Sequence, residues 1–177
     1  MLIGLVSAAA LLLAAAGLAK LLQRAPLRSA LAAAGVPGAQ RLSAKTANRL
    51  SGAVELAVAL LALLVGGRVG AALIAVAYLV LAGLSARMMV IESGQDCGCF
   101  AKPVAVSHWH TAVNLSCALA GLIALVQPSG SLISQFGQQP VTAAALLLAA
   151  AVLAYLGYLV MTALPELTAA TKLEVAG

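Results

Sequence analysis

Two cysteines separated by a single glycine are the residues of this chain best suited to chemistry: Cys97 and Cys99. Thiols this close can form a small, strained disulfide ring, and Gly98 between them gives the backbone the freedom that such a ring needs. A strained and exposed disulfide is oxidising and labile, which suits thiol–disulfide exchange better than a structural role. The motif therefore predicts a redox-active pair, and two idle thiols are the plain alternative.

Basic and imidazole side chains follow the cysteines in the same polar stretch. Lys102, His108 and His110 can stabilise a thiolate, which is the reactive form of cysteine. The stretch also supplies four soft or borderline ligands of the kind that zinc and copper take, namely Cys97, Cys99, His108 and His110. Metal binding or transport is therefore a second hypothesis, whereas the redox hypothesis needs no metal.

One face of the helix expected after this loop carries a stripe of polar and small residues: His110, Asn114, Cys117 and Gly121. Their spacing of i, i+4, i+7 and i+11 places them above one another on a helix. The stripe predicts a polar path from the cysteines into the membrane, where an electron acceptor such as quinone could bind. The alternatives are structural, because His108 and His110 flank Trp109 as interfacial anchors do, and Cys117 is small enough to be a packing residue.

Two further ionisable residues, Lys20 and Glu55, lie inside apolar runs. Ionisable groups within membrane spans are costly and usually face the interior of a bundle. Both residues are expected near the membrane face that carries the cysteine loop, so we predict that they pair, in either a structural or a functional role. Arg87 lies near the same face, at the end of its apolar run, where its side chain can reach out to the interface.

These residues are set in a chain that is too apolar for a soluble domain. Of its 177 residues, 63% are hydrophobic and 8% are charged, whereas soluble domains carry about 25% charged residues. About 20 apolar residues span a bilayer, and five runs approach that length, at residues 2–22, 50–65, 69–90, 109–126 and 141–164. We therefore expect an all-α, multi-pass transmembrane helix bundle, formed as a single membrane domain over residues 1–177, with a four-helix core plus one helix.

The segments between these apolar runs also contain patterns that predict local structure. Apolar residues at helical spacing predict a short interfacial helix between the first two spans, ending at residues 35–38: Leu27, Ala30, Leu31 and Ala34. Gly66, Gly67 and Arg68 predict a tight turn, and residues 127–140 predict a polar loop. Pro165 predicts the end of the fifth span.

The basic residues are distributed unevenly over the two ends of the expected bundle. With five spans, nine of the ten lysines and arginines fall on the side of the cysteine loop, and only Arg68 falls on the other. The positive-inside rule then places the Cys97–Cys99 loop in the cytoplasm. Disulfides persist more readily outside the cytoplasm, so the charge pattern conflicts with a disulfide-forming role. Because the net charge of +5 lies in loops that orient the chain, the lipid bilayer is the expected partner and a nucleic acid is not.

The cysteine motif and its placement resemble a known family. Cys97-Gly98-Cys99-Phe100, after a third span, is similar to the CGCFG motif of the MauE-type (methylamine utilisation) proteins, which belong with the DoxX-like redox-associated membrane proteins. The resemblance covers roughly residues 5 to 125, with supporting stretches at Ala16–Lys20, Leu31–Pro37, Val54–Ala57 and Asn114. Ala101 stands where the family has glycine, and Val113 stands where a basic residue is expected.

The resemblance implies a thiol–disulfide redox protein of the bacterial inner membrane. Cys97 and Cys99 would exchange electrons with a thioredoxin-like partner and so support the maturation of other proteins. His108 or His110 would transfer protons to and from the pair. A non-catalytic accessory subunit of a larger membrane complex is the third hypothesis, and in that case the cysteines would be dispensable.

Overall fold

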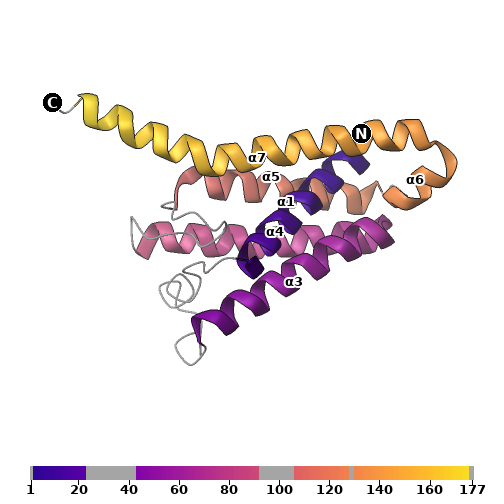
Figure 1. The fold of residues 1–177 in the computed structure, drawn as a ribbon, viewed down its shortest axis with the longest axis horizontal. Coiled ribbons are helices and arrows are strands. Elements are labelled where there is room, and N and C mark those ends of the chain that lie inside the picture. Colours follow the sequence, from indigo (N-terminus) through magenta and orange to yellow (C-terminus); the bar gives the residue numbers. More distant parts are fainter. Residues whose placement is uncertain (1, 23–42, 92–105, 128–129, 176–177) are drawn as a thin grey trace.

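The protein is an assembly of α-helices (Figure 1). The computed structural model describes residues 2–22, 43–91, 106–127 and 130–175, and within these ranges it contains six helices and no strand. The helices are α1 (Leu2–Leu22), α3 (Ala44–Val65), α4 (Gly67–Ile91), α5 (His108–Val126), α6 (Leu132–Gln138) and α7 (Pro140–Val175). All but α6 are long and apolar enough to cross a membrane, which confirms the predicted all-α bundle of five spans.

Helix α1 is the centre of this bundle. It contacts α3, α4, α5 and α7, while α4 packs along α5 on one side and against α3 on the other. In Figure 1, α7 lies along the outside of α1 and α5 and extends beyond them towards the C-terminus. The architecture is therefore a four-helix core of α1, α3, α4 and α5 with α7 added to one side.

Alanine supplies most of the core. Buried alanines of α1, α3, α4 and α5 surround three large side chains, Leu13, Ile74 and Tyr78. Lipid tails are as apolar as leucine, so helices in a membrane gain stability from close packing, and small side chains permit it. The sequence therefore places its small residues where helices meet.

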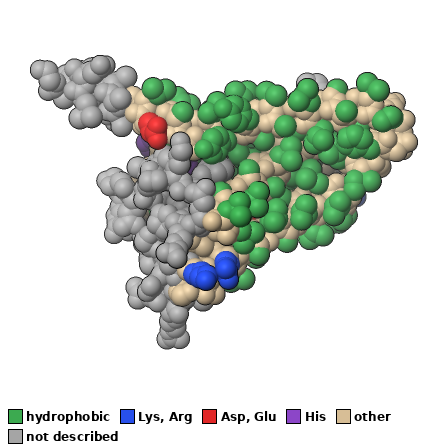
Figure 2. Space-filling model, in the orientation of Figure 1, with side chains coloured by type: hydrophobic (Ala, Val, Ile, Leu, Met, Phe, Trp, Pro, Cys, Tyr) green, Lys and Arg blue, Asp and Glu red, His purple; other side chains and the backbone are tan. Residues whose placement is uncertain are grey.

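Large apolar side chains cover the outer faces of the helices instead (Figure 2). They include Leu50, Val54, Leu61 and Leu64 of α3, Val76 and Val80 of α4, and Val152 and Leu156 of α7. In the view of Figure 2 the charged side chains lie towards the end of the bundle at which α3 begins. This surface is suited to contact with lipid tails along the helices and with water or headgroups at that end.

The closest approach of two backbones that bears on the site lies between α1 and α3. A Cβ atom added to Gly17 would lie 2.8 Å from the carbonyl oxygen of Gly52, and one added to Gly52 would lie 2.7 Å from the carbonyl oxygen of Gly17. Real Cβ atoms essentially never come so close to backbone atoms. Glycine on both helices is therefore what allows α1 and α3 to touch at this level.

Glycine also makes the turn between α3 and α4. Gly66 and Gly67 have φ values of 61° and 56°, in the left-handed region that a side chain disfavours. The turn predicted from Gly66, Gly67 and Arg68 is thus present, with α4 already beginning at Gly67. It reverses the chain so tightly that α3 and α4 pack side by side.

Helix α3 begins earlier than the apolar run predicted. It starts at Ala44 rather than at residue 50, because Ser43 caps it: the Ser43 hydroxyl accepts a hydrogen bond of 3.1 Å from the Thr46 amide. The first two turns are polar, so hydropathy alone does not mark them. The added turns carry Asn48, which is buried.

Two expectations near the C-terminus are wrong. The predicted polar loop over residues 127–140 contains a short helix, α6, whose first turn is capped by the Ser131 hydroxyl. Pro165 does not end the last helix, since α7 continues to Val175 with Pro165 inside it. A proline removes one amide donor from a helix, and the helical residues on both sides keep this one continuous. The interfacial helix predicted from Leu27 to Ala34 lies outside the described residues.

We expect Gly17→Ala to lower the free energy of unfolding by about 1–3 kcal/mol, because the added methyl group would overlap the backbone of α3. Denaturant titration of the detergent-solubilised protein measures this change.

Gly83→Ala is the matched control. Gly83 also lies within a helix, but an added Cβ there meets nothing within 4 Å. That variant should be neutral or more stable by up to about 1 kcal/mol, because alanine is the better helix former. Equal effects of the two substitutions would contradict the close approach of α1 and α3.

Candidate functional site

The site candidates gather at one end of the bundle. Helices α1 and α4 end there, at Leu22 and Ile91, and α3 and α5 begin there, after Ser43 and Ser107. We call this the loop end. Cys97, Cys99 and Lys102 belong to the stretch between Ile91 and Val106, outside the described residues, so their assignment stays a prediction from sequence.

A buried ion pair joins α1 to α3. The ammonium group of Lys20 donates a hydrogen bond to Oε1 of Glu55, and the hydroxyl of Ser51 donates to the same oxygen over 3.2 Å. Lys20 is 3% exposed and Glu55 is 8% exposed. The pairing predicted from the sequence is therefore present, and Ser51 is an additional member.

The glycine contact positions this pair. Gly17 precedes Lys20 by three residues and Gly52 precedes Glu55 by three residues, so each glycine lies on nearly the same face of its helix as the charged residue. Because the two helices are antiparallel, each charged residue lies beside the glycine of the other helix, and the missing side chains leave room for the pair; the Cβ of Glu55 is 3.2 Å from the position that a Cβ on Gly17 would take. Lys20 also packs its Cβ 3.2 Å from the position that a Cβ on Gly52 would take.

Glu55 lies near the loop end, as the sequence indicated. The Cβ of Glu55 is 3.2 Å from the position that a Cβ on Gly17 would take, and Gly17 is five residues, or about 8 Å, from the end of α1 at Leu22. The earlier start of α3 at Ala44 therefore adds polar turns beyond the end of α1.

One oxygen of Glu55 has no visible donor. Oε2 is buried and has no hydrogen-bond partner among the described residues, whereas Oε1 accepts two hydrogen bonds. An unpaired buried acceptor is expensive, and more so for a carboxylate. The arrangement therefore leaves a strong acceptor unpaired among the described residues and enclosed within the bundle.

A second polar contact joins α4 to α5. The side-chain amide of Asn114 donates to the Ser85 hydroxyl over 3.3 Å, and that hydroxyl donates to the Leu81 carbonyl oxygen over 2.6 Å. Both side chains are buried. Two turns away along α4, towards the middle of the helix, the Tyr78 hydroxyl donates to the Ala9 carbonyl oxygen over 2.7 Å, which ties α4 to α1.

A small cavity lies between the two polar groups. Lys20, Tyr78 and Asn114 line it together with apolar residues of α1, α4 and α7, and its volume is about 20 Å³. That is enough for about one water molecule. The ion pair and the Asn114–Ser85 contact thus border one shared space inside the bundle.

The two histidines at the start of α5 differ in environment. His108 is exposed, whereas His110 is 1% exposed. The Ser107 amide donates to Nδ1 of His110 over 3.2 Å, and the Ser107 hydroxyl lies 3.0 Å from the same nitrogen. Since Nδ1 accepts from the amide, the ring proton of neutral His110 is on Nε2. His110 therefore closes the first turn of α5.

The other predicted residues of the α5 stripe and the loop end also include both buried and exposed side chains. Asn114 and Gly121 are buried, and Cys117 is half-buried, packed against two apolar clusters of the core, one around Leu13 and Tyr78 and one around Leu12 and Met161. Arg87 is exposed, as expected for a side chain that reaches out to the interface. Among the described residues no three histidine, cysteine or acidic side chains come close enough to hold a metal ion. The four-ligand set that includes Cys97 and Cys99 stays a prediction.

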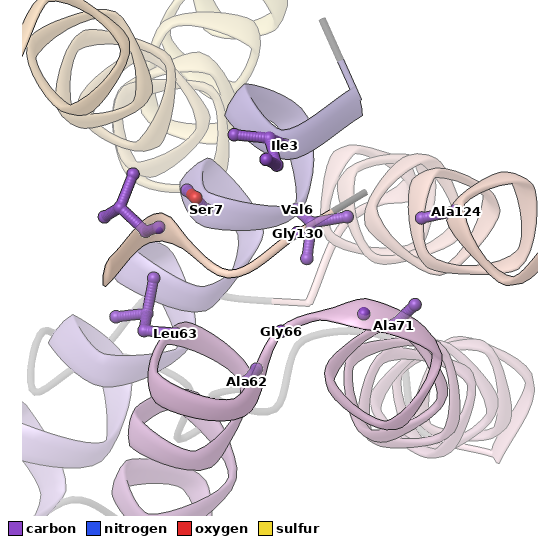
Figure 3. Close-up of a pocket in the computed structure, with 11 residues that line it drawn as sticks. Ile3, Val6, Ser7, Ala62, Leu63, Gly66, Ala71, Ala124 and Gly130 are labelled. Carbon is purple, nitrogen blue, oxygen red and sulfur yellow. The ribbon is translucent and has the colours of Figure 1, made fainter. Parts of the chain in front are cut away.

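The opposite end of the bundle holds no comparable chemistry in the part that the structure describes. Figure 3 shows a cavity there of about 20 Å³, between the first turns of α1, the end of α3 and the start of α4. Of its eleven lining residues, only Ser7 has a polar side chain. The basic residues were predicted to be concentrated at one end of the bundle, and the buried charged side chains lie towards that same end.

Sequence reasoning missed four polar residues, of which three lie towards the loop end and Tyr78 lies mid-way along α4: Asn48, Ser51, Ser85 and Tyr78. A signal for them was present. Asn48 and Ser51 share a helix face with Glu55, at spacings of seven and four residues, and Tyr78 and Ser85 are seven residues apart in α4. Polar residues at such spacing within apolar helices mark a face turned to the bundle interior.

The fold and this polar cluster define the chain as a multi-pass helical membrane protein with ionisable and amide side chains buried between its spans. The family model described as "Methylamine utilisation protein MauE" matches residues 1–127. The match covers well over half of the chain, which therefore belongs to the MauE family, as the cysteine motif indicated. It includes the four-helix core and ends after α5, so α6 and α7 lie beyond it. No curated protein and no solved structure gives a significant match.

We expect Lys20→Met and Glu55→Gln each to lower the free energy of unfolding by about 3–5 kcal/mol, because each leaves a buried polar or charged partner unpaired. Denaturant titration of the solubilised variants measures the loss.

The double variant Lys20→Met/Glu55→Leu should recover most of that stability, since apolar residues can replace a buried pair at little cost. Strictly additive losses in the double variant would show that the two side chains do not depend on each other.

Proposed function

We propose that this protein is a membrane thiol–disulfide redox protein of methylamine utilisation, working in the bacterial inner membrane. Cys97 and Cys99 exchange electrons with a thioredoxin-like partner and so support the maturation of other proteins. The observation that carries the proposal is the Cys97-Gly98-Cys99 motif between α4 and α5 in a chain of the MauE family. The five apolar helices support its place in a membrane.

The described residues on either side of the cysteine stretch support the proposal. Val106, which follows the cysteine stretch, packs against buried Met88 in the last turns of α4. The residues that flank the stretch on both sides are thus held on the four-helix core. Because both flanks are fixed at the loop end, a partner that reaches the thiols must dock at that end of the bundle.

The exchange follows the ordinary chemistry of thiols. One thiolate of the pair attacks a sulfur of the partner's disulfide, the partner's S–S bond breaks, and a mixed disulfide forms. The second thiolate attacks that mixed disulfide, which releases the partner as a dithiol and closes the Cys97–Cys99 disulfide. Two electrons pass to the partner, and the two protons lost from the pair end on the partner's thiols. The reverse reaction reduces the pair, and the difference in reduction potential sets the direction.

The described residues take different parts in this scheme. His108, exposed at the start of α5, is placed to exchange protons with water beside the cysteine stretch. His110 and Asn114 are positioning residues, because they fix the start of α5 and its contact with α4. Lys20 and Glu55 hold α1 against α3 beneath the same end. Cys117 is a packing residue of the core.

Thiol trapping tests the proposal. Cells are quenched with acid, and free thiols are labelled with a reagent that shifts the protein on a gel. We expect Cys97 and Cys99 to change together between dithiol and disulfide when growth conditions change, and Cys97→Ser or Cys99→Ser to abolish that change.

Cys117→Ser is the matched control, since it removes a cysteine from the core and should leave the redox change intact. A pair that keeps one redox state under every growth condition would overturn the proposal. Wild-type methylamine growth of Cys97→Ser cells would instead favour an accessory subunit.

The charge pattern gives a separate prediction for the side of the membrane. Lys20 is buried in an ion pair, so of the nine basic residues on the cysteine side eight remain to orient the chain, against Arg68 alone. We expect a membrane-impermeant maleimide to leave Cys97 and Cys99 unlabelled in intact cells.

Arg68→Cys, introduced into a variant without the native cysteines, is the control for access to the opposite side and should be labelled. Labelling of Cys97 and Cys99 in intact cells would reverse the predicted orientation and place the redox pair outside the cytoplasm.

A further inference from the structure

Tyr155 lies on the outer face of α7, close to the middle of the membrane. Its side chain is 60% exposed. Gly157, two residues further along α7, gives the depth: a Cβ added there would lie 3.2 Å from Cδ2 of Leu12, which is the middle residue of α1 (Leu2–Leu22). Two helical residues cover about 3 Å, so Tyr155 is near the level at which α1 is half-way through the bilayer.

The hydroxyl of Tyr155 needs a hydrogen-bond partner at this depth. Its ring stacks on Tyr158, with 6.4 Å between the ring centroids, while the hydroxyl makes no hydrogen bond within the part of the chain that the structure describes. The middle of a hydrocarbon core about 30 Å thick is about 15 Å from water, which is beyond the reach of a tyrosine side chain. Because an unpaired hydroxyl in an apolar medium is costly, a partner must bring a hydrogen-bonding group to Tyr155 within the membrane.

The residues around Tyr155 form a continuous strip along α7, which we call the outer strip. Its members are all exposed and lie at alternating intervals of four and three residues: Val141, Ala145, Leu148, Val152 and Tyr155. That spacing is the one by which two helices pack along a shared seam. The opposite side of α7 packs on the bundle through buried residues: Ala143, Ala150 and Met161.

Helix α7 is also the least covered of the five spans. It forms one edge of the bundle in Figure 1, and 11% of its apolar stretch is buried, against 28–44% for the other four spans. The outer strip is therefore a helix-pairing surface that the rest of the described chain does not cover.

We propose that the outer strip of α7 packs against the same strip of a second copy of this chain, forming a two-fold symmetric dimer in the membrane. Two copies inserted in the same orientation are related by an axis perpendicular to the membrane, so the two α7 helices run parallel. In such an interface a residue near the axis meets its own counterpart. Tyr155 then lies beside the partner subunit's Tyr155, and one hydroxyl donates a hydrogen bond to the other.

A second copy fits this strip better than other membrane components do. A phenolic hydroxyl is both a donor and an acceptor, so two of them at the same depth satisfy each other. No residue from Pro140 to Pro165 is charged, so the strip offers nothing that would select a charged helix. Acyl chains carry no hydrogen-bonding group, and the ester and phosphate groups of lipids lie at the membrane surface.

This inference goes beyond the proposed function and does not depend on it. The interface involves neither Cys97 nor Cys99, and α7 lies beyond residues 1–127, which the MauE model matches. Because the two copies are parallel, both loop ends face the same side of the membrane. The dimer can therefore be measured whether or not the thiols react.

Cysteine cross-linking tests the interface. The background is the full-length protein with its three native cysteines replaced by serine: Cys97, Cys99 and Cys117. Val152→Cys places a thiol on the outer strip, and Leu153→Cys is the matched control, because it places one at nearly the same depth on another side of α7. We expect mild oxidation in membranes to link Val152→Cys into a dimer at least about 5-fold more than Leu153→Cys. No dimer from Val152→Cys, or equal cross-linking of the two variants, would overturn the proposal.

Tyr155→Phe tests the hydroxyl pair and leaves the ring in place. Hydrogen bonds between membrane helices contribute modestly, so we expect the variant to dimerise about 3- to 20-fold more weakly than the wild type. Single-molecule photobleaching of labelled full-length protein in liposomes, over a range of protein-to-lipid ratios, measures this affinity.

Tyr158→Phe is the matched control for the hydroxyl. It makes the same change three residues further on, at a half-buried tyrosine that packs against Leu12 and Met161, and should alter the affinity less than about 2-fold. Unchanged dimerisation of Tyr155→Phe would overturn the hydroxyl pair. A wild-type protein that stays monomeric at every ratio would overturn the dimer and leave the outer strip to lipid or to a helix of another protein.

Discussion

The ion pair between Lys20 and Glu55 is the interaction on which the loop end depends. Two charges inside a span are tolerated only if they meet, because an uncompensated charge there is strongly destabilising. They meet because Gly17 and Gly52 let the backbones of α1 and α3 touch one turn away. A side chain at either glycine would separate the helices and the charges together. The packing of small residues and the burial of charge are therefore one constraint.

The rest of the core extends from α1, the helix that holds Lys20. Tyr78 ties α4 to α1 and Asn114 ties α5 to α4, so the four helices matched by the MauE family are linked by polar contacts as well as by alanine packing. In lipid such contacts choose among many similar apolar packings.

Much of the fold follows from local pattern. Five apolar runs predicted five spans, and Gly66-Gly67 predicted the turn between α3 and α4, because both depend on neighbouring residues alone. The errors have local causes too. The polar first turns of α3 concealed its start at Ala44, after the Ser43 cap, and Pro165 suggested an end that the flanking helical residues override. Hydropathy records which residues prefer lipid, and it does not record where a capped polar turn begins.

The sequence by itself determined the class of the protein, its family, the Cys97–Cys99 motif and the need for Lys20 and Glu55 to find partners. Only the tertiary structure decided who those partners are. Ser51 and the Gly17–Gly52 contact beside the ion pair, and Ser85 for Asn114, come from helix crossings that no single helix specifies. The separation of exposed His108 from buried His110 has the same origin. Composition and spacing state what a residue requires, and the packing of one helix against another determines which atom meets that requirement.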